Sequence, residues 1–269
     1  MAEEQKEGGS LDQEIEKLTG MARDEAIIAQ QERIQNEIKE ANPLVSEKQD
    51  LAILNEEYRD DPIYTQKVKD LIAHYSHVRK TRGDGNCFFR AFGFAYLEKL
   101  LLDKVELHRF KGIASKSKDE LVSLGFPAFT IEDFHETFME VLQQVEEPGS
   151  SLVALSDTFN DQGISDYLVV YLRLLTSGQL QKEAEFYQNF IEGDRPVKDF
   201  CNQEVEPMAK ESDHIHIIAL TSAVGVGVRV VYLDRGEAEK VNHHDFPEGC
   251  RIQIILLYRP GHYDILYPD

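Results

Sequence analysis

The run from Asp84 to Phe89 constrains this chain most, because it places a cysteine between a glycine-containing turn and a long apolar segment. The apolar segment extends from Phe88 to Leu102 and has the length and composition of a buried helix, so we expect Cys87 in its first turn. A helix N-terminus carries partial positive charge and unpaired N–H groups. Both favour the thiolate, which is the nucleophilic form of cysteine. Cys87 is therefore a candidate for covalent catalysis, provided that a base lies nearby.

The expected base lies close to the other end of the chain. Residues 252–258 have the composition of a buried strand, residues 259–261 form a Pro-Gly turn, and a second strand starts at His262. Strand side chains alternate between faces, so His262 and Asp264 point to the same side, where the carboxylate can orient the imidazole. Alone, this pattern also fits a hairpin with surface His and Asp residues. Together with Cys87, it favours a nucleophile–base–orienter arrangement.

Other chemistries fit the sequence poorly. A calcium loop starting at Asp84 fails, because Phe88 and Phe89 occupy positions that need an oxygen ligand and a glycine. His214 and His216 lie in an apolar stretch typical of a helix, where side chains two residues apart diverge. No Gly-x-Ser-x-Gly nucleophile elbow is present. We therefore predict neither a metal nor a cofactor.

The composition limits the partners of the chain. A net charge of −20 argues against nucleic-acid binding, which needs a basic face. The same charge fits a partner with a basic surface, but it also fits a role in solubility alone. No apolar run reaches the roughly 18 residues of a membrane span. Three cysteines (Cys87, Cys201 and Cys250) indicate a reducing compartment without a disulfide framework.

The chain divides into three predicted parts. Residues 1–20 are expected to form a disordered acidic tail, and residues 21–42 an amphipathic helical arm in which isoleucines recur at helical spacing. The arm either caps the core or binds a partner. Residues 43–269 form the main domain, where several helices precede a few late strands, which predicts an α+β fold. The expected helices are 62–76, 131–146 with its N-cap at Thr130, 165–176 ending at Ser177-Gly178, and 213–223, and a further strand is expected at 226–233.

The Asp-Gly-Asn-Cys-Phe-Phe-Arg run and the late Gly-His-Tyr-Asp resemble the ovarian-tumour (OTU) class of deubiquitinating cysteine proteases. The resemblance is closer to the otubains, and closest to the otubain one type, and it runs from about residue 23 to the C-terminus. It implies a papain-like OTU fold, in which a helical subdomain packs on a small, mostly antiparallel sheet and an N-terminal helical arm precedes it. Residues 43–269 would then be the OTU catalytic domain.

The resemblance also implies a reaction. Proteins of this family hydrolyse isopeptide bonds in polyubiquitin, and those of the otubain one type prefer the lysine-forty-eight linkage. Cys87 would be the nucleophile, His262 the base and Asp264 its orienter, and Asp84 matches a further active-site position of the family. We expect Asp84 to shape the turn, and the backbone N–H groups of Asp84, Gly85 and Cys87 to bind the oxyanion.

The expected partners are ubiquitin, polyubiquitin and ubiquitin-conjugating enzymes, in the cytoplasm and nucleus. Ile27 and Ile34 of the arm would contact the leaving-side ubiquitin. Tyr187 and Phe190 are candidates for the distal ubiquitin, with core packing as the alternative. Proteins of this type also block ubiquitin-charged conjugating enzymes without catalysis, with Thr130 as a candidate contact, so an inhibitory binding module is a second hypothesis. A generic papain-like peptidase is a third.

Overall fold

The computed structural model describes residue 30 and residues 42–193, 195–236 and 240–268. The predicted acidic tail and nearly all of the predicted arm, including Ile27 and Ile34, lie outside these residues. The domain boundaries therefore stay a prediction. The compact unit that spans residues 44–269 holds every element that we discuss.

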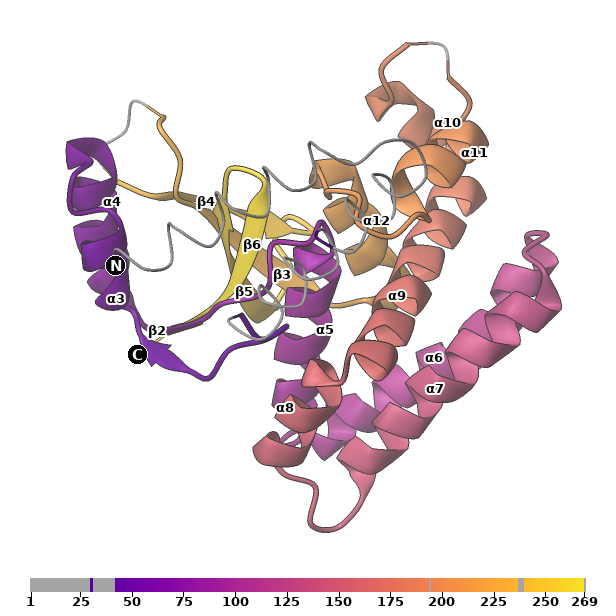
Figure 1. The fold of residues 1–269 in the computed structure, drawn as a ribbon. Coiled ribbons are helices and arrows are strands. Elements are labelled where there is room, and N and C mark those ends of the chain that lie inside the picture. The colour runs from indigo at the N-terminus through magenta and orange to yellow at the C-terminus, as the bar shows by residue number, and fades with distance from the viewer. Residues whose placement is uncertain (1–29, 31–41, 194, 237–239, 269) are drawn as a thin grey trace, which may run out of the picture. The chain divides into compact units, whose positions relative to one another are not determined.

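A six-stranded sheet forms the centre of this unit, in the order β1-β2-β6-β5-β3-β4 (Figure 1). Every neighbouring pair is antiparallel except β3 and β5, which are parallel. The prediction of a mostly antiparallel sheet is confirmed. The strands are β1 (Gln49–Asp50), β2 (Tyr75–Arg79), β3 (Gly227–Tyr232), β4 (Asn242–Phe246), β5 (Ile252–Arg259) and β6 (His262–Pro268).

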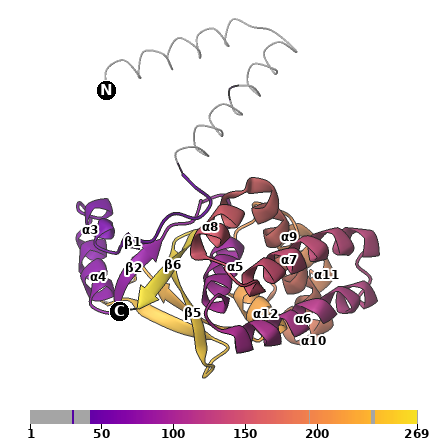
Figure 2. The ribbon, with the colours of Figure 1, turned by 90° about the horizontal axis from the view of Figure 1, so that it is seen from below.

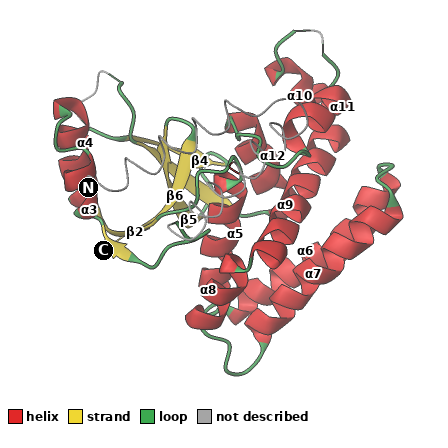
Figure 3. Ribbon diagram, viewed as in Figure 1, coloured by secondary structure: helices red, strands yellow, loops and turns green. Residues whose placement is uncertain are grey.

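Helices make up most of the rest of the unit, which confirms the α+β class (Figure 3). Among the described residues, we find no helix whose length and apolar character would let it span a bilayer. The helices are α3 (Ile53–Glu57), α4 (Pro62–Ile72), α5 (Cys87–Leu100), α6 (Lys104–Ser123), α7 (Ala128–Glu146), α8 (Leu152–Asn160), α9 (Gln162–Lys182), α10 (Ala184–Tyr187), η1 (Gln188–Phe190), α11 (Val197–Phe200), η2 (Cys201–Val205) and α12 (His214–Val224).

The two faces of the sheet carry separate apolar clusters, as the alternation of strand side chains requires. On one face, α3 and α4 pack against Val231, Leu257 and Leu266. On the other, α5 and helices α6–α9 pack against Val230 and Ile265, among others. Figures 1 and 2 both show α3 and α4 on one side of the sheet and α5 on the other. The sheet is therefore covered on both faces.

Helix α5 is buried nearly all round, which explains the long apolar run of the sequence. Twelve of its fourteen residues are buried. The Phe94 ring, which is fully buried, meets the Phe159 ring of α8 edge to face, with 5.3 Å between the ring centroids. Because α5 starts at Cys87, this packing fixes the position of the cysteine.

Three predicted boundaries were wrong. Helix α7 starts at Ala128 after Pro127 as N-cap, so Thr130 lies inside the helix and does not cap it. Helix α9 does not end at Gly178 but continues to Lys182. The glycine serves helix packing instead: a Cβ atom at this position would lie 2.5 Å from the Leu121 side chain of α6. Tyr75 belongs to β2, where it pairs with Pro268, and not to the helix before it.

We expect Phe94→Ala to lower the free energy of unfolding by about 3–5 kcal/mol, because it leaves a cavity between α5 and α8. Val153→Ala on α8 is the matched control, since the Val153 side chain is 71% exposed and its loss should change stability by less than about 0.5 kcal/mol. Urea denaturation of both variants measures the difference. Equal effects of the two substitutions would contradict this account of the core.

Candidate active site

Cys87 is the first residue of α5, as the sequence predicted, and the turn before it requires glycine. Gly85 has a φ of +75°, in the region that side chains other than glycine rarely adopt. A Cβ atom on Gly85 would also lie 2.4 Å from the carbonyl oxygen of Ala209. The turn thus packs directly against the backbone of a segment more than a hundred residues away, and a larger residue at position 85 would displace Cys87.

Asp84 shapes this turn through its side chain. Its Oδ1 atom accepts a hydrogen bond from the N–H of Asn86 at 2.9 Å, and its carboxylate forms an ion pair with the fully buried Arg90 at 2.8 Å. Its own N–H, however, donates to the carbonyl of Arg82 at 3.0 Å. That N–H is therefore engaged within the turn, contrary to its expected role as an oxyanion donor. The N–H groups of Gly85 and Cys87 have no hydrogen-bond partner among the described residues.

A second buried arginine ties the turn to the facing segment. Arg173 of α9 donates through Nη2 to the carbonyls of Gly85 and Lys210 and to Oδ1 of Asn86, at 2.8–2.9 Å. The same Asn86 oxygen accepts the N–H of Ala209 at 2.9 Å. Our reading of the sequence missed both arginines. The signal was there, since each is a lone charge within an apolar helical run and needs a buried partner.

The hairpin of β5 and β6 supplies the other two predicted groups. The Nε2 atom of His262 lies 2.8 Å from Oδ1 of Asp264, and the same oxygen accepts the N–H of Thr81 at 2.9 Å. Asp264 has no exposed surface, and Arg259 pairs with its second oxygen. The other ring nitrogen of His262, Nδ1, is then the one available to Cys87, whose interaction with the imidazole helps to raise the pKa of His262. The three side chains thus meet although 175 positions separate the cysteine from the histidine.

The electrostatics of this group favour a charged imidazole. Burial lowers the pKa of His262, but the hydrogen bonds with Asp264 and Cys87 outweigh it and raise the pKa to about 9. Burial raises the pKa of Asp264, yet its bond to His262 and the charge of Arg259 hold it below its usual range. By contrast, burial raises the pKa of Cys201 to about 11. The arrangement is suited to a thiolate beside an imidazolium.

The predicted contact residues differ in exposure. Tyr187 is 1% exposed and packs in a cluster with Leu180 and Phe200, so it is a core residue and its predicted role as a surface contact was wrong. Phe190 is 54% exposed at the end of η1. Thr130 is also exposed, in the first turn of α7. Of the predicted contacts within the described residues, Phe190 and Thr130 are therefore accessible.

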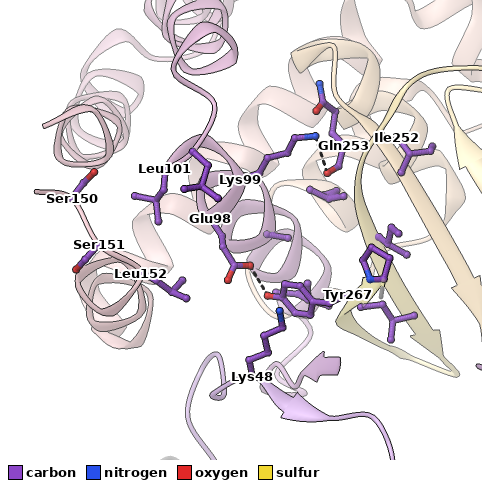
Figure 4. A pocket seen from close by; sticks show the side chains of 17 residues that line it. Lys48, Glu98, Lys99, Leu101, Ser150, Ser151, Leu152, Ile252, Gln253 and Tyr267 are labelled. Carbon is purple, nitrogen blue, oxygen red and sulfur yellow. Dashed lines mark hydrogen bonds between the residues drawn. The ribbon is translucent and has the colours of Figure 1, made fainter. Parts of the chain in front are cut away.

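An apolar pocket of about 670 Å³ lies at the opposite end of α5 (Figure 4). Its walls include Leu101 and Leu102 after α5, Ile254 of β5 and Tyr267 of β6. Figure 4 shows Glu98 hydrogen-bonded to Tyr267 within it. Cys87 and His262 do not line this pocket, so it is separate from the candidate active site.

Comparisons with known proteins agree with this geometry. The family model of Peptidase C65 Otubain matches residues 37–268. The chain is 61% identical over 258 residues to the human ubiquitin thioesterase OTUB1, covering 96% of this chain and 95% of that protein. It is 44% identical over 248 residues to the OVARIAN TUMOR DOMAIN-containing deubiquitinating enzyme 1 of Arabidopsis thaliana, covering 84% of this chain and 81% of that protein.

Solved structures match as well. The complex described as "h/ceOTUB1-ubiquitin aldehyde-UBCH5B~Ub" superposes with a TM-score of 0.85 at 39% identity, over 93% of this chain and 100% of the matched chain. A complex with UBC13~Ub matches with the same TM-score, identity and coverage. The likeness therefore extends across nearly the whole fold.

The raised pKa of His262 can be tested directly. We expect its imidazole to titrate at about pH 9 in the wild type, and well below that in Asp264→Asn, where burial acts without the carboxylate. Because the pKa is raised from 6.5, protonated His262 stabilises the fold fully below about pH 6.5, and this contribution is lost as pH rises through about 9. NMR titration of the histidine resonances measures both values. An unchanged midpoint in Asp264→Asn would refute the assignment.

Proposed function

This chain belongs to the otubain family of peptidases, and we propose that it hydrolyses isopeptide bonds in polyubiquitin with Cys87 as nucleophile. The observation that carries the proposal is the hydrogen bond of 2.8 Å between Asp264 and Nε2 of His262, which leaves Nδ1 of the imidazole for Cys87 at the start of α5. The pKa of His262 is raised by both residues, Asp264 and Cys87. Similar relatives are named as ubiquitin thioesterases, and matched structures hold ubiquitin aldehyde. The proposal thus rests on geometry and on relatives that agree.

The reaction follows from the contacts. The Cys87 sulfur, having given its proton to Nδ1 of His262, attacks the carbonyl carbon of the isopeptide bond. The tetrahedral intermediate collapses, the C–N bond breaks, and His262 returns the proton to the leaving lysine amine. A water molecule then attacks the thioester, with His262 taking its proton, and frees the ubiquitin carboxylate and the thiol. Asp264 keeps the imidazole in one orientation throughout.

The oxyanion needs donors close to the cysteine. The N–H groups of Gly85 and Cys87 are suited to this role, because neither has a hydrogen-bond partner among the described residues and both belong to the segment that carries the nucleophile. One such donor typically lowers the barrier by about 3 kcal/mol. The bonds from Arg173 and Ala209 to the turn hold these donors in place before substrate arrives.

The distal ubiquitin is expected to occupy a groove beside Phe190. A pocket of about 430 Å³ is lined by Phe190, Glu204 and Glu211, among others, and the Glu211 carboxylate lies close to Gly261 in the turn before His262. Its acidic rim complements the basic residues that surround the apolar patch of ubiquitin. The preference for the lysine-forty-eight linkage belongs to the proposal too, with the arm residues Ile27 and Ile34 holding the second ubiquitin.

A second activity is the non-catalytic inhibition of ubiquitin-charged conjugating enzymes. Two of the matched structures contain OTUB1 together with UBCH5B~Ub or UBC13~Ub, and each match covers 93% of this chain. Thr130 and the neighbouring Phe129, which is 87% exposed, offer an accessible contact at the start of α7. We place both activities in the cytoplasm and nucleus, which agrees with three free cysteines.

A panel of eight diubiquitin linkages tests the enzymatic proposal. The wild type should cleave the lysine-forty-eight dimer and leave the others largely intact, while Cys87→Ala should lose activity by at least about a thousandfold. Cys201→Ala is the control for general thiol loss and should cleave like the wild type if it folds. Activity retained in Cys87→Ala would end the enzymatic proposal, and equal cleavage of all linkages would end the linkage preference alone.

Deletion of residues 1–42 separates the two activities. Because the deletion keeps the whole compact unit, we expect chain cleavage to weaken through a higher KM, with kcat little changed. Inhibition of a ubiquitin-charged conjugating enzyme, measured as chain synthesis in vitro, should be lost. Cys87→Ala in the full chain should show the reverse, with cleavage lost and inhibition kept. A deletion variant that retains both activities would remove the arm from the proposal.

A further inference from the structure

Arg259 lies on the same face of the sheet as the two hairpin residues of the candidate active site. In the register of β5 and β6, Arg259 is directly opposite His262, and Leu257 is directly opposite Asp264. Opposite residues of an antiparallel pair share a face, and the face repeats every second residue. The two-residue turn Pro260-Gly261 thus brings a guanidinium, an imidazole and a carboxylate together.

The contacts of Asp264 leave neither of its oxygens free. Oδ1 accepts the N–H of Thr81 and lies 2.8 Å from Nε2 of His262, as described above. Oδ2 forms an ion pair with Nη2 of Arg259. Asp264 has no exposed surface, so water does not substitute for any of these partners. The orientation of the carboxylate therefore depends on Arg259 as much as on the backbone.

Arg259 is itself held from the opposite side of its guanidinium. Its Nη1 atom lies 3.3 Å from Oε2 of Glu57, the last residue of α3, and 3.5 Å from the Tyr58 hydroxyl. Glu57 also pairs with Lys80, which follows β2. The Arg259 side chain is only 18% exposed and lies between the carboxylates of Glu57 and Asp264. Another rotamer would break both ion pairs.

We propose that Arg259 is a positioning residue, which keeps Asp264 ionised and aimed at His262 while Glu57 of α3 holds its guanidinium in place. A buried carboxylate that loses a cation in direct contact with one of its oxygens is strongly destabilised, and protonation is the usual response. Once protonated, Asp264 no longer favours the charged imidazole. The effect on Cys87 then passes through His262, without any contact between Arg259 and the substrate.

Several charged groups face this cluster and shape its titration. His262 and Asp264 come from β6, Glu57 from α3 and Lys80 from the end of β2, while the Glu211 carboxylate lies beside Gly261 in the turn. Cys87 at the start of α5 completes the set. Among them, Arg259 is the cation in direct contact with Oδ2 of Asp264, so its removal should act on Asp264 first.

The test measures the rate at which iodoacetamide alkylates Cys87 between pH 5 and pH 8. Arg259→Gln keeps one donor but removes the charge. In a plot of alkylation rate against pH, the acid limb is the range in which the rate rises with pH. We expect the acid limb of Arg259→Gln to lie about one pH unit higher than that of the wild type. Alkylation should then be about tenfold slower on the acid side and little changed at pH 8. Arg259→Lys restores the charge, and its acid limb should return close to that of the wild type. Peptide mass spectrometry separates Cys87 from Cys201 and Cys250.

Arg229→Gln is the matched control. It removes an ion pair with Asp245 at 2.7 Å between β3 and β4, in the same sheet, without touching the candidate catalytic residues. Its acid limb should coincide with that of the wild type. A merely structural role for Arg259 predicts slower alkylation at every pH with an unmoved limb, and that result would overturn the proposal. If Arg259→Gln does not fold, an acid limb displaced in Arg259→Lys would overturn it equally.

The inference rests on the proposed function only in treating His262 and Asp264 as the catalytic pair, and the readout needs no ubiquitin. A displaced acid limb in a protein that cleaves no diubiquitin would uphold the role of Arg259 and reject the hydrolase. An unmoved limb in an active hydrolase would reject the role of Arg259 alone. The two proposals therefore fail separately.

Discussion

The buried carboxylate of Asp264 is the point on which the candidate active site depends. It joins the backbone after β2, the imidazole of β6 and the guanidinium of β5 in one hydrogen-bonded group. A fully buried carboxylate is tolerated in a protein only where hydrogen-bond donors or cations bind its oxygens, and both oxygens of Asp264 have such partners. The central strands and the catalytic geometry are therefore stabilised by the same contacts, so a substitution that loosens one of them loosens the other.

On the cysteine side of the site, the buried charges are cations, and protein acceptors likewise bind them. Arg90 and Arg173 are completely buried cations whose donors bind the turn before Cys87. Arg90 lies on α5 and Arg173 on α9, so these contacts fix the turn before Cys87 relative to the helices. The hairpin that carries His262 is part of the sheet. The alignment of Cys87 with His262 then depends on how the helices pack on the sheet. The edge-to-face contact between Phe88 and Tyr263, with 5.3 Å between the ring centroids, is part of that packing next to both residues.

Sequence patterns predicted the fold class, the helix after the cysteine and the late hairpin, because each depends on local periodicity or on a Pro-Gly turn. They failed where tertiary packing decides. Gly178 does not end its helix, since Leu121 fills the space that a side chain would occupy. Tyr187 belongs to an aromatic run that has the same sequence pattern whether it is buried or exposed. It is buried because residues of α9, α11, η2 and α12 pack in one cluster with it. The bond from the N–H of Thr81 to Asp264 could not be foreseen either, because the two residues are 183 positions apart in the sequence.

The position of β6 within the sheet has a consequence for how a peptide tail can approach. This strand is flanked by β2 and β5, so neither of its sides is an open edge. Among the described strands, the outermost are the two-residue β1 and β4, with its polar Asn-His-His-Asp run. A ligand that adds itself to a sheet as an extra strand would thus be guided away from His262. The extended tail of a substrate must instead cross the ends of the strands, where loops and side chains bind it. Recognition of the tail then depends on the residues of those loops and not on backbone hydrogen bonds to the sheet.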